Sequence, residues 1–190
     1  MKDLVPKYQL CTELRSVRPC GELHRQSLNK LGMLVQEVVD VESPVHKTEV
    51  IKRIRSLWGL LRTGERIQKA LEAGIRHEIK TGAVRDKSDF LFSKRSRAII
   101  PRRREGTPPA DLDLICDDEI VAGIKFVLEH QFSTFPEDLC LQVCRIFGIQ
   151  AKHDEETTRI ECVIVRLRAE SVLEELPNKM LKLSEPKNGK

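Results

Sequence analysis

Five cationic side chains recur through residues 62–80 at a spacing that places them on one side of a helix. They are Arg62, Arg66, Lys69, Arg76 and Lys80. At 100° per residue all five fall in a sector about 80° wide. Six residues of the stretch fall on the opposite side, namely Ile67, Ala70, Leu71, Gly74, Ile75 and Ile79. The pattern predicts a helix with one face in a core and a narrow cationic stripe facing out, an arrangement suited to phosphate groups.

Two interpretations of this stripe are open from the sequence. In a helix-turn-helix module the helix after the turn enters the major groove of DNA, where its cations meet phosphates and guanine edges. Alternatively, Glu65, Glu72 and Glu78 offer partners to the cations at helical spacing, which leaves an ordinary solvated face. Contact with duplex DNA is the interpretation that we favour.

A second basic cluster lies in the segment 93–115, which is rich in Pro and Arg. It contains the run Arg102, Arg103 and Arg104. Flexible arms of this kind follow a phosphate backbone, so the three arginines are also candidate nucleic-acid contacts. Solvated linker charge explains the run equally well, and both interpretations stay open at this point.

The sequence contains no recognisable catalytic set. It lacks the GxxxxGK[ST] phosphate-binding loop, which excludes ATP hydrolysis by that route, and it lacks an acidic nuclease motif. The acidic stretch "DLDLICDDE", residues 111–119, fits a helix N-terminus better than a metal site. The six cysteines lack metal-site spacing, and Cys140 and Cys144 fit two small buried hydrophobes. We therefore expect no enzymatic activity, no metal, no cofactor and no small-molecule substrate.

Two further side chains are assigned to structure rather than to chemistry. His46 stands directly before the second predicted helix and has no partner nearby in sequence for proton transfer, so we expect it to cap or pack. Trp58 ends an apolar stripe at helical spacing, so we expect it in the core.

Charge divides unevenly along the chain, although the net charge is only +4. Residues 1–43 balance at zero, with six cations and six acids. Residues 44–104 carry seventeen cations against six acids, or +11, and residues 105–190 carry ten cations against seventeen acids, or −7. A basic module joined to an acidic one indicates an anionic partner for the first and a different role for the second.

The sequence carries no sign of membrane insertion or secretion. No apolar run approaches the roughly 18 residues that a membrane-spanning helix needs. The N-terminus lacks the apolar centre of a secretory signal, and we interpret the cysteines as reduced thiols. A cytoplasmic location without membrane contact is expected.

An internal repeat sets the expected architecture. Trp58-Gly59 aligns with Phe147-Gly148 at an offset of 89 residues. The same offset places Val35, Val38 and Val39 on Ile124, Val127 and Leu128. Arg66-Ile67 matches Arg159-Ile160 at an offset of 93, which corresponds to a four-residue insertion. Because apolar positions match in all three segments, the chain is expected to contain two copies of one fold.

Each copy reads as three helices followed by a hairpin. In the first copy the first helix is expected at about 29–41 and the third at about 63–80. The second is expected to begin at Thr48-Glu49 and to end at a left-handed cap at Gly59. Two short strands around a turn at 86–89 follow the third helix. The second predicts helices at about 117–130, 136–147 and 155–170, then a hairpin within 172–183.

Three helices followed by a two-stranded wing is the order of elements in a winged helix-turn-helix fold. The expected fold is therefore α+β and helix-dominated, with two winged helices in tandem. The expected parts are an N-terminal extension, 1–28; a basic winged helix, 29–93; a Pro- and Arg-rich linker, 94–116; an acidic winged helix, 117–184; and a tail, 185–190.

The run "ESPVHKTEVIKRIRSLWGLLRTGERI", residues 42–67, with "DFLF" at 89–92, resembles an uncharacterised bacterial domain family. That domain stands at the C-terminal end of very large proteins that carry a superfamily 1 helicase-type ATPase and often a restriction-endonuclease-like segment. The resemblance extends over roughly residues 8 to 184. In the second copy "RTGERI" is replaced by "AKHDEETTRI", which argues against an equivalent role there.

The sequence thus predicts a non-catalytic DNA-binding accessory domain that contacts duplex DNA through the third helix of the first copy. The resemblance implies that a helicase or nuclease module, of the same or a partner chain, works with it. The alternative is a protein–protein interaction module in a nucleic-acid-processing assembly, without direct DNA contact. The acidic second copy, which has no cationic stripe, fits that alternative better.

Overall fold

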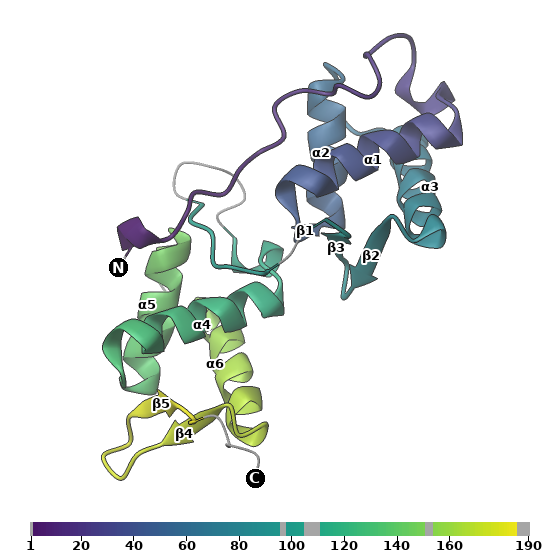
Figure 1. Cartoon of the computed structure of the whole chain (residues 1–190). Coiled ribbons are helices and arrows are strands. Elements are labelled where there is room, and N and C mark those ends of the chain that lie inside the picture. Colours follow the sequence, from purple (N-terminus) through teal and green to yellow (C-terminus); the bar gives the residue numbers. More distant parts are fainter. Residues whose placement is uncertain (1, 96–97, 105–110, 151–153, 186–190) are drawn as a thin grey trace. The chain divides into compact units, whose positions relative to one another are not determined.

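A computed structural model of the chain describes residues 2–95, 98–104, 111–150 and 154–185 (Figure 1). The structure is α+β, as expected, and the described residues form six α-helices and two small antiparallel sheets. They divide into two compact units: residues 9–98 form one, and residues 1–8 with 99–190 form the other. We name them the basic unit, with eighteen cations against eleven acids, and the acidic unit, with fifteen against eighteen.

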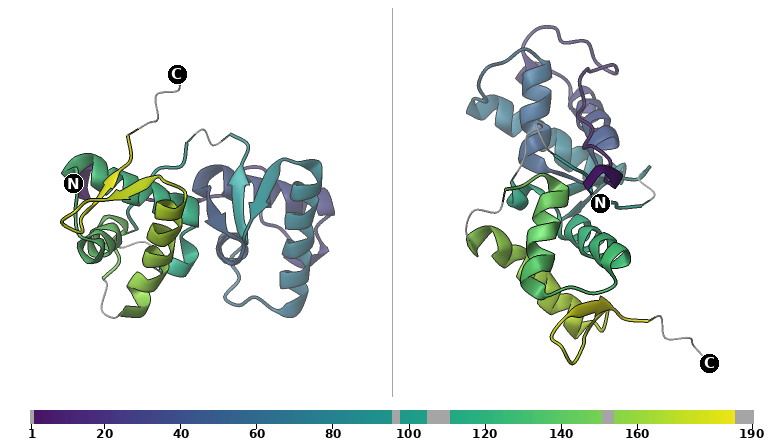
Figure 2. Two further views of the ribbon diagram at one scale, coloured as in Figure 1. Left: turned by 90° about the horizontal axis from the view of Figure 1, so that it is seen from below. Right: turned by 90° about the vertical axis from the view of Figure 1, so that its left-hand side faces the viewer.

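Three helices precede the hairpin in the basic unit. Its elements are α1, Leu28–Glu42; β1, Val45–His46; α2, Lys47–Leu57; α3, Glu65–Thr81; β2, Val84–Lys87; and β3, Phe90–Ser93. The sheet order is β1-β3-β2, and both outer strands are antiparallel to β3 (Figure 2). The residues just before α2 are therefore tied to the hairpin that follows α3.

Local capping sets the ends of these elements. The His46 ring caps α2 by accepting a hydrogen bond from the Thr48 backbone N–H at 3.3 Å, and the ring packs edge-on against Phe90, so the expectation for this histidine is confirmed. Gly59 has the predicted left-handed conformation, with φ of 79°. Ser88 and Asp89 also have positive φ, the conformation that a tight two-residue hairpin turn requires.

The core of the basic unit lies between α1, α2 and α3. The predicted inner face of α3 is confirmed: Leu71, Gly74 and Ile75 are buried, and the other three apolar residues of that face pack against the same cluster. Gly74 lies so close to α1 that an added Cβ would be 3.0 Å from the Leu31 Cβ atom. Trp58 is buried as predicted, and its indole N–H donates to the Gly21 carbonyl at 3.1 Å.

The acidic unit repeats this order of elements. It contains α4, Asp117–Gln131; α5, Pro136–Phe147; α6, Asp154–Ala169; β4, Leu173–Glu175; and β5, Leu181–Leu183. Thr134, between α4 and α5, forms an isolated antiparallel bridge with Leu181 of β5. This bridge takes the place that β1 has in the basic unit. Short 3-10 turns complete the described elements at Lys2–Leu4, Leu23–Arg25 and Leu112–Leu114.

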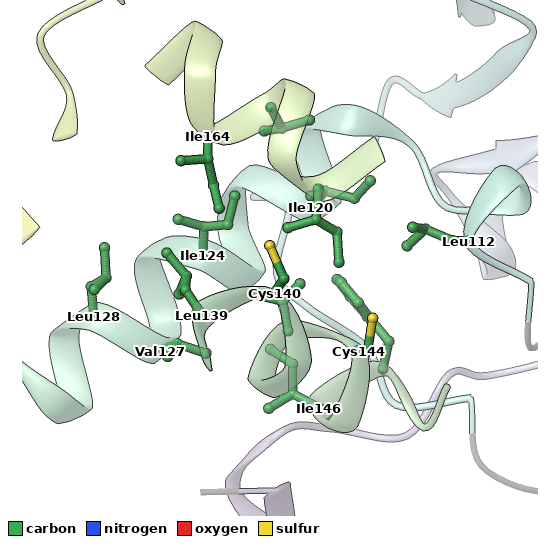
Figure 3. Packing of buried hydrophobic residues seen from close by; sticks show 14 of the residues in the cluster. Leu112, Ile120, Ile124, Val127, Leu128, Leu139, Cys140, Cys144, Ile146 and Ile164 are labelled. Atoms are coloured by element: carbon green, nitrogen blue, oxygen red, sulfur yellow. The ribbon is translucent and has the colours of Figure 1, made fainter. Parts of the chain in front are cut away.

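Aliphatic side chains of α4, α5 and α6 fill the core of the acidic unit (Figure 3). Phe147 is fully buried there, as its match to Trp58 predicts. Cys140 and Cys144 point into this cluster, and burial raises the pKa of the Cys140 thiol to about 12. Both cysteines are therefore buried core residues, as the sequence indicates.

The segment from Ile99 to Arg104 is part of the acidic unit, not a free linker. Arg103 donates its backbone N–H to the Pro6 carbonyl at 2.8 Å and accepts from the Tyr8 N–H at 2.9 Å. The Arg104 N–H donates to the Phe147 carbonyl at 2.8 Å. The expected extension 1–28 and linker 94–116 are thus both divided between the two units, because these backbone pairings hold residues 2–8 against 99–104 (Figure 1).

Candidate nucleic-acid interface

The predicted cationic stripe lies on and just before α3. Arg66, Lys69, Arg76 and Lys80 belong to the helix, and Arg62 lies in the α2–α3 connection, because α3 begins at Glu65 after the cap residue Gly64. The helical period therefore does not fix the direction of Arg62. All five side chains are exposed, while the face that includes Leu71 is buried against α1.

Two of the five cations have carboxylate neighbours on the same helix. The Lys69 Nζ atom lies 2.5 Å from Glu65, with both side chains more than two-thirds exposed, and Arg76 lies 4.0 Å from Glu72. Exposed pairs of this kind contribute about 0.2–0.5 kcal/mol, so a phosphate can displace them. Arg62, Arg66 and Lys80 form no ion pair with any residue that the structure describes. The stripe is therefore available to an anion.

The β2–β3 hairpin is nearly neutral by sequence, with two cations and two acids, but both of its acids pair with a residue outside the hairpin. Lys47, at the start of α2, lies 2.7 Å from Asp86 and 2.9 Å from Asp89. Its partial burial would lower the pKa of Lys47, but hydrogen bonds to the two carboxylates outweigh this and raise it. With the two acids paired, the exposed Arg85, whose guanidinium lies 5.7 Å from the Phe92 ring centre, is a further cation outside the predicted stripe. No local signal could reveal this, since Lys47 is 39 residues from Asp86.

A cleft of about 470 Å³ borders the stripe on one side. Ile51, Ile75 and Ile79 contribute apolar lining, and the carboxylates Glu72, Asp86 and Asp89 also line it. Lys47 and Arg76 line the cleft as well, but both cations already have carboxylate neighbours there. The carboxylates thus oppose entry of a phosphate group. An anion is therefore expected on the outward face of α3 and not inside the cleft.

The run Arg102, Arg103 and Arg104 has a structural place that the sequence did not reveal. Arg104 is 1% exposed and donates two hydrogen bonds of 2.9 Å to the carboxylate of Glu119, which is itself fully buried. Arg102 binds the same carboxylate at 2.7 Å, and Arg103 lies 3.2 Å from Asp3. The Tyr8 ring lies within 4.7 Å of the Arg102 and Arg104 guanidinium carbons. The interpretation of these three residues as a mobile phosphate-binding arm must therefore be corrected.

Glu119 was expected only to face the helix dipole at the start of α4. Burial by itself would raise the pKa of Glu119, but the charges of Arg104 and Arg102 and their hydrogen bonds outweigh burial and lower it. Asp117 shows the same balance, with a pKa lowered by Arg159 and Arg166 against its partial burial. Glu119 is thus the centre of a buried ion-pair cluster in the acidic unit, and Asp117 forms a partly exposed one. Within the described parts of the chain, no group of three or more His, Cys, Asp or Glu side chains is placed to hold a metal.

None of the six described helices combines the length and apolarity needed to cross a membrane.

No curated protein and no solved structure gives a significant match to the chain. Residues 21–69 match the model of a family described as "Protein of unknown function (DUF3320)". The match covers α1, α2 and the first turn of α3, including Arg62, Arg66 and Lys69. It supports the resemblance of this segment to an uncharacterised domain family, and this segment carries the start of the cationic stripe.

Proposed function

We propose that the chain is a non-catalytic, cytoplasmic DNA-binding accessory domain built of two winged helices, and that its basic unit contacts duplex DNA through α3. The observation that carries the proposal is the exposure of the four α3 cations opposite a buried apolar face, with the exposed Arg62 just before the helix. Through its resemblance to the helicase-associated family, the domain would serve a helicase or nuclease module of the same or a partner chain.

The topology supports the winged-helix part of the proposal. A strand before the second helix pairs with the last strand of the hairpin in the basic unit, and Thr134 makes the matching bridge in the acidic unit. In helix-turn-helix modules the helix that follows the turn is the one that enters the major groove. In the basic unit that helix is α3.

Phosphate contacts would supply most of the affinity. Five contacts release about five condensed counterions, so log K is expected to fall against log salt with a slope of roughly −4 to −5. Arg66 lies in the first turn of α3, where recognition helices usually meet base edges. Any sequence preference is therefore expected from Arg66 or from the neighbouring Arg62.

Fluorescence anisotropy with a labelled duplex over a salt series tests the proposal. The triple variant Arg66→Ala, Lys69→Ala, Arg76→Ala should bind more weakly and flatten the salt slope by about three units. The matched control is Lys125→Ala, Arg145→Ala, Lys179→Ala, which removes the same charge from exposed positions of the acidic unit. If both triples change binding equally, the affinity reflects net charge alone and α3 has no special part.

The second candidate function is a protein-interaction module. It is favoured by the acidic unit, whose third helix α6 carries no equivalent of the five-cation stripe and whose surface exposes aromatic side chains. Retention of full DNA affinity by the α3 triple variant would make this the leading function.

A further inference from the structure

The connection between α4 and α5 exposes two aromatic rings. Phe132 is 83% exposed and Phe135 is 45% exposed. By contrast, Phe90, Phe92 and Phe147 are all buried. Only 4% of the residues in this chain are aromatic, so two rings left in water within four residues are unusual. Such exposed apolar groups, rimmed by polar residues, mark interaction surfaces.

The backbone at Phe132 is strained. Its φ of 64° and ψ of −46° lie in a region that side-chain-bearing residues rarely adopt. The Ser133 N–H donates to the Gln131 carbonyl at 2.7 Å, which closes a three-residue γ-turn of the rare, strained kind. A glycine would adopt this conformation without the steric cost, yet the position holds a large exposed ring. Strain kept at an exposed aromatic residue points to a function for that ring.

Hydrogen bonds hold this turn in place on both sides. The Phe132 N–H donates to the Leu128 carbonyl at 2.8 Å, which continues the last turn of α4. Thr134 is buried and exchanges two hydrogen bonds with Leu181 of β5, at 3.1 and 2.8 Å. The two rings therefore project from a backbone that is fixed to a helix and to a strand. A fixed apolar group loses little conformational entropy when a partner binds it.

Carboxylates surround the two rings along the chain. Glu129 precedes them in the last turn of α4, and Glu137 and Asp138 follow them in the first turn of α5; all three are exposed. None of the three forms an ion pair with a residue that the structure describes. The α5 face continues through the partly exposed Leu141 to Arg145, which is the one cation on that path. Lys125 and Lys182 line a groove together with Glu129, but the three carboxylates are the charges nearest to the two rings along the chain. The surface is thus apolar with a mainly anionic rim.

We propose that this corner, formed by Phe132, Phe135, Glu129, Glu137 and Asp138, is a docking surface for a polypeptide segment of another protein that carries apolar side chains beside Lys or Arg. The apolar side chains would cover the two rings, and the cations would pair with the three carboxylates. Nucleic acid also stacks on exposed aromatic rings, but its phosphates would meet the same three carboxylates, so a cationic polypeptide fits better. This role is separate from DNA contact by α3.

Binding of a labelled synthetic peptide of Leu and Lys at helical spacing, measured by anisotropy, tests the proposal. The 190-residue chain should bind it, and Phe132→Ser with Phe135→Ser should weaken binding at least tenfold. The matched control is Val165→Ser, which removes a 64% exposed apolar side chain from α6 and should leave binding unchanged. A peptide with Glu in place of each Lys should not bind. Equal binding by the double variant and by the control would overturn the proposal.

The variant Phe132→Gly separates recognition from structure. It removes the ring and the backbone strain together, so peptide binding should fall while the unfolding temperature stays equal or rises. A lower unfolding temperature would instead give the ring a structural role and overturn the proposal. Two other results would also overturn the proposal. If the chain binds single-stranded oligothymidine and the Phe132→Ser, Phe135→Ser variant does not, the corner binds nucleic acid. If the chain sediments in a concentration-dependent way and this variant does not, the corner binds a second copy. The Phe132→Ser, Phe135→Ser variant should bind duplex DNA with the affinity of the wild-type chain, because peptide docking at this corner is separate from DNA contact by α3.

Discussion

Arg104 donates to both carboxylate oxygens of Glu119 at 2.9 Å each, and both side chains are buried. The pair joins the segment before α4 to the first turn of that helix, and Arg102 adds a second guanidinium on the same carboxylate. A bidentate pair of this geometry is strong once formed, but it leaves a costly buried charge when one partner is removed.

The variant Glu119→Gln should therefore destabilise the acidic unit by about 3–5 kcal/mol, because two buried guanidinium groups lose their counter-charge. Urea unfolding followed by circular dichroism measures the change. Arg145→Ala removes an exposed arginine of the same unit and should change stability by less than about 0.5 kcal/mol. A loss below 1 kcal/mol for Glu119→Gln would show that the centre tolerates an unpaired charge.

Acid should weaken the same unit. The pKa values of Glu119 and Asp117 are lowered in the folded chain by their arginine partners, so the folded state binds fewer protons than the unfolded chain. Their stabilisation is present above about pH 4–4.5, the ordinary range for carboxyl groups, and is lost as pH falls through the lowered values. The free energy of unfolding of the wild-type chain should fall steeply between pH 6 and pH 3. The free energy of unfolding of the Glu119→Gln variant should fall less steeply over the same range. Parallel pH curves would exclude this carboxylate as the cause.

Trp58 and Phe147 occupy matching positions at the ends of α2 and α5, and both are buried. Truncation of either to Ala should cost about 3–5 kcal/mol of stability in its own unit. Trp58→Phe keeps most of the packing but loses the hydrogen bond to Gly21, so it should cost only about 1 kcal/mol. Thermal and urea unfolding by circular dichroism measure all three variants. Near-equal losses for Trp58→Ala and Trp58→Phe would mean that the hydrogen bond, not packing, matters at this site.

Gly74 sets how closely α3 approaches α1. In an isolated helix Gly→Ala gains about 1 kcal/mol of stability. Here an added Cβ would lie 3.0 Å from the Leu31 Cβ and 3.1 Å from its backbone carbon, so Gly74→Ala should destabilise by about 1–3 kcal/mol. Gly64→Ala, with no atom within 4 Å of an added Cβ, is the steric control; because Gly64 is the N-cap of α3, it should cost about 1 kcal/mol or less. A stabilised Gly74→Ala variant would show that α1 and α3 separate easily.

The carboxylates beside the stripe should oppose DNA. Replacing Glu65 and Glu72 by Gln removes the partners of Lys69 and Arg76 while the fold of the exposed helix face stays the same. Duplex affinity should rise roughly three- to tenfold at low salt, since one exposed charge interaction is worth about 1 kcal/mol or less in water. The gain should shrink as salt increases. Unchanged affinity would indicate that DNA does not approach this face.

The helices, the hairpins and the inner face of each helix could be predicted from the order of residues alone. Predicted helix ends differ from the observed ones by at most two residues, because caps such as His46 and Gly59, and the apolar period, act within a few residues of the chain. The repeat also placed Trp58 and Phe147 in equivalent buried positions, since each residue ends the apolar stripe of its own helix.

Which charged side chains face water depends on long-range contacts in the folded chain. Arg66 and Arg104 are the same residue type in basic runs, yet Arg66 is exposed and Arg104 is buried on Glu119. The difference arises because backbone pairing holds residues 2–8 against 99–104 and brings that arginine over α4. Lys47 likewise pairs with Asp86 only in the folded unit, because α3 lies between the two residues in the sequence. Such contacts join residues that lie fifteen to about a hundred positions apart, and no local period or composition encodes them.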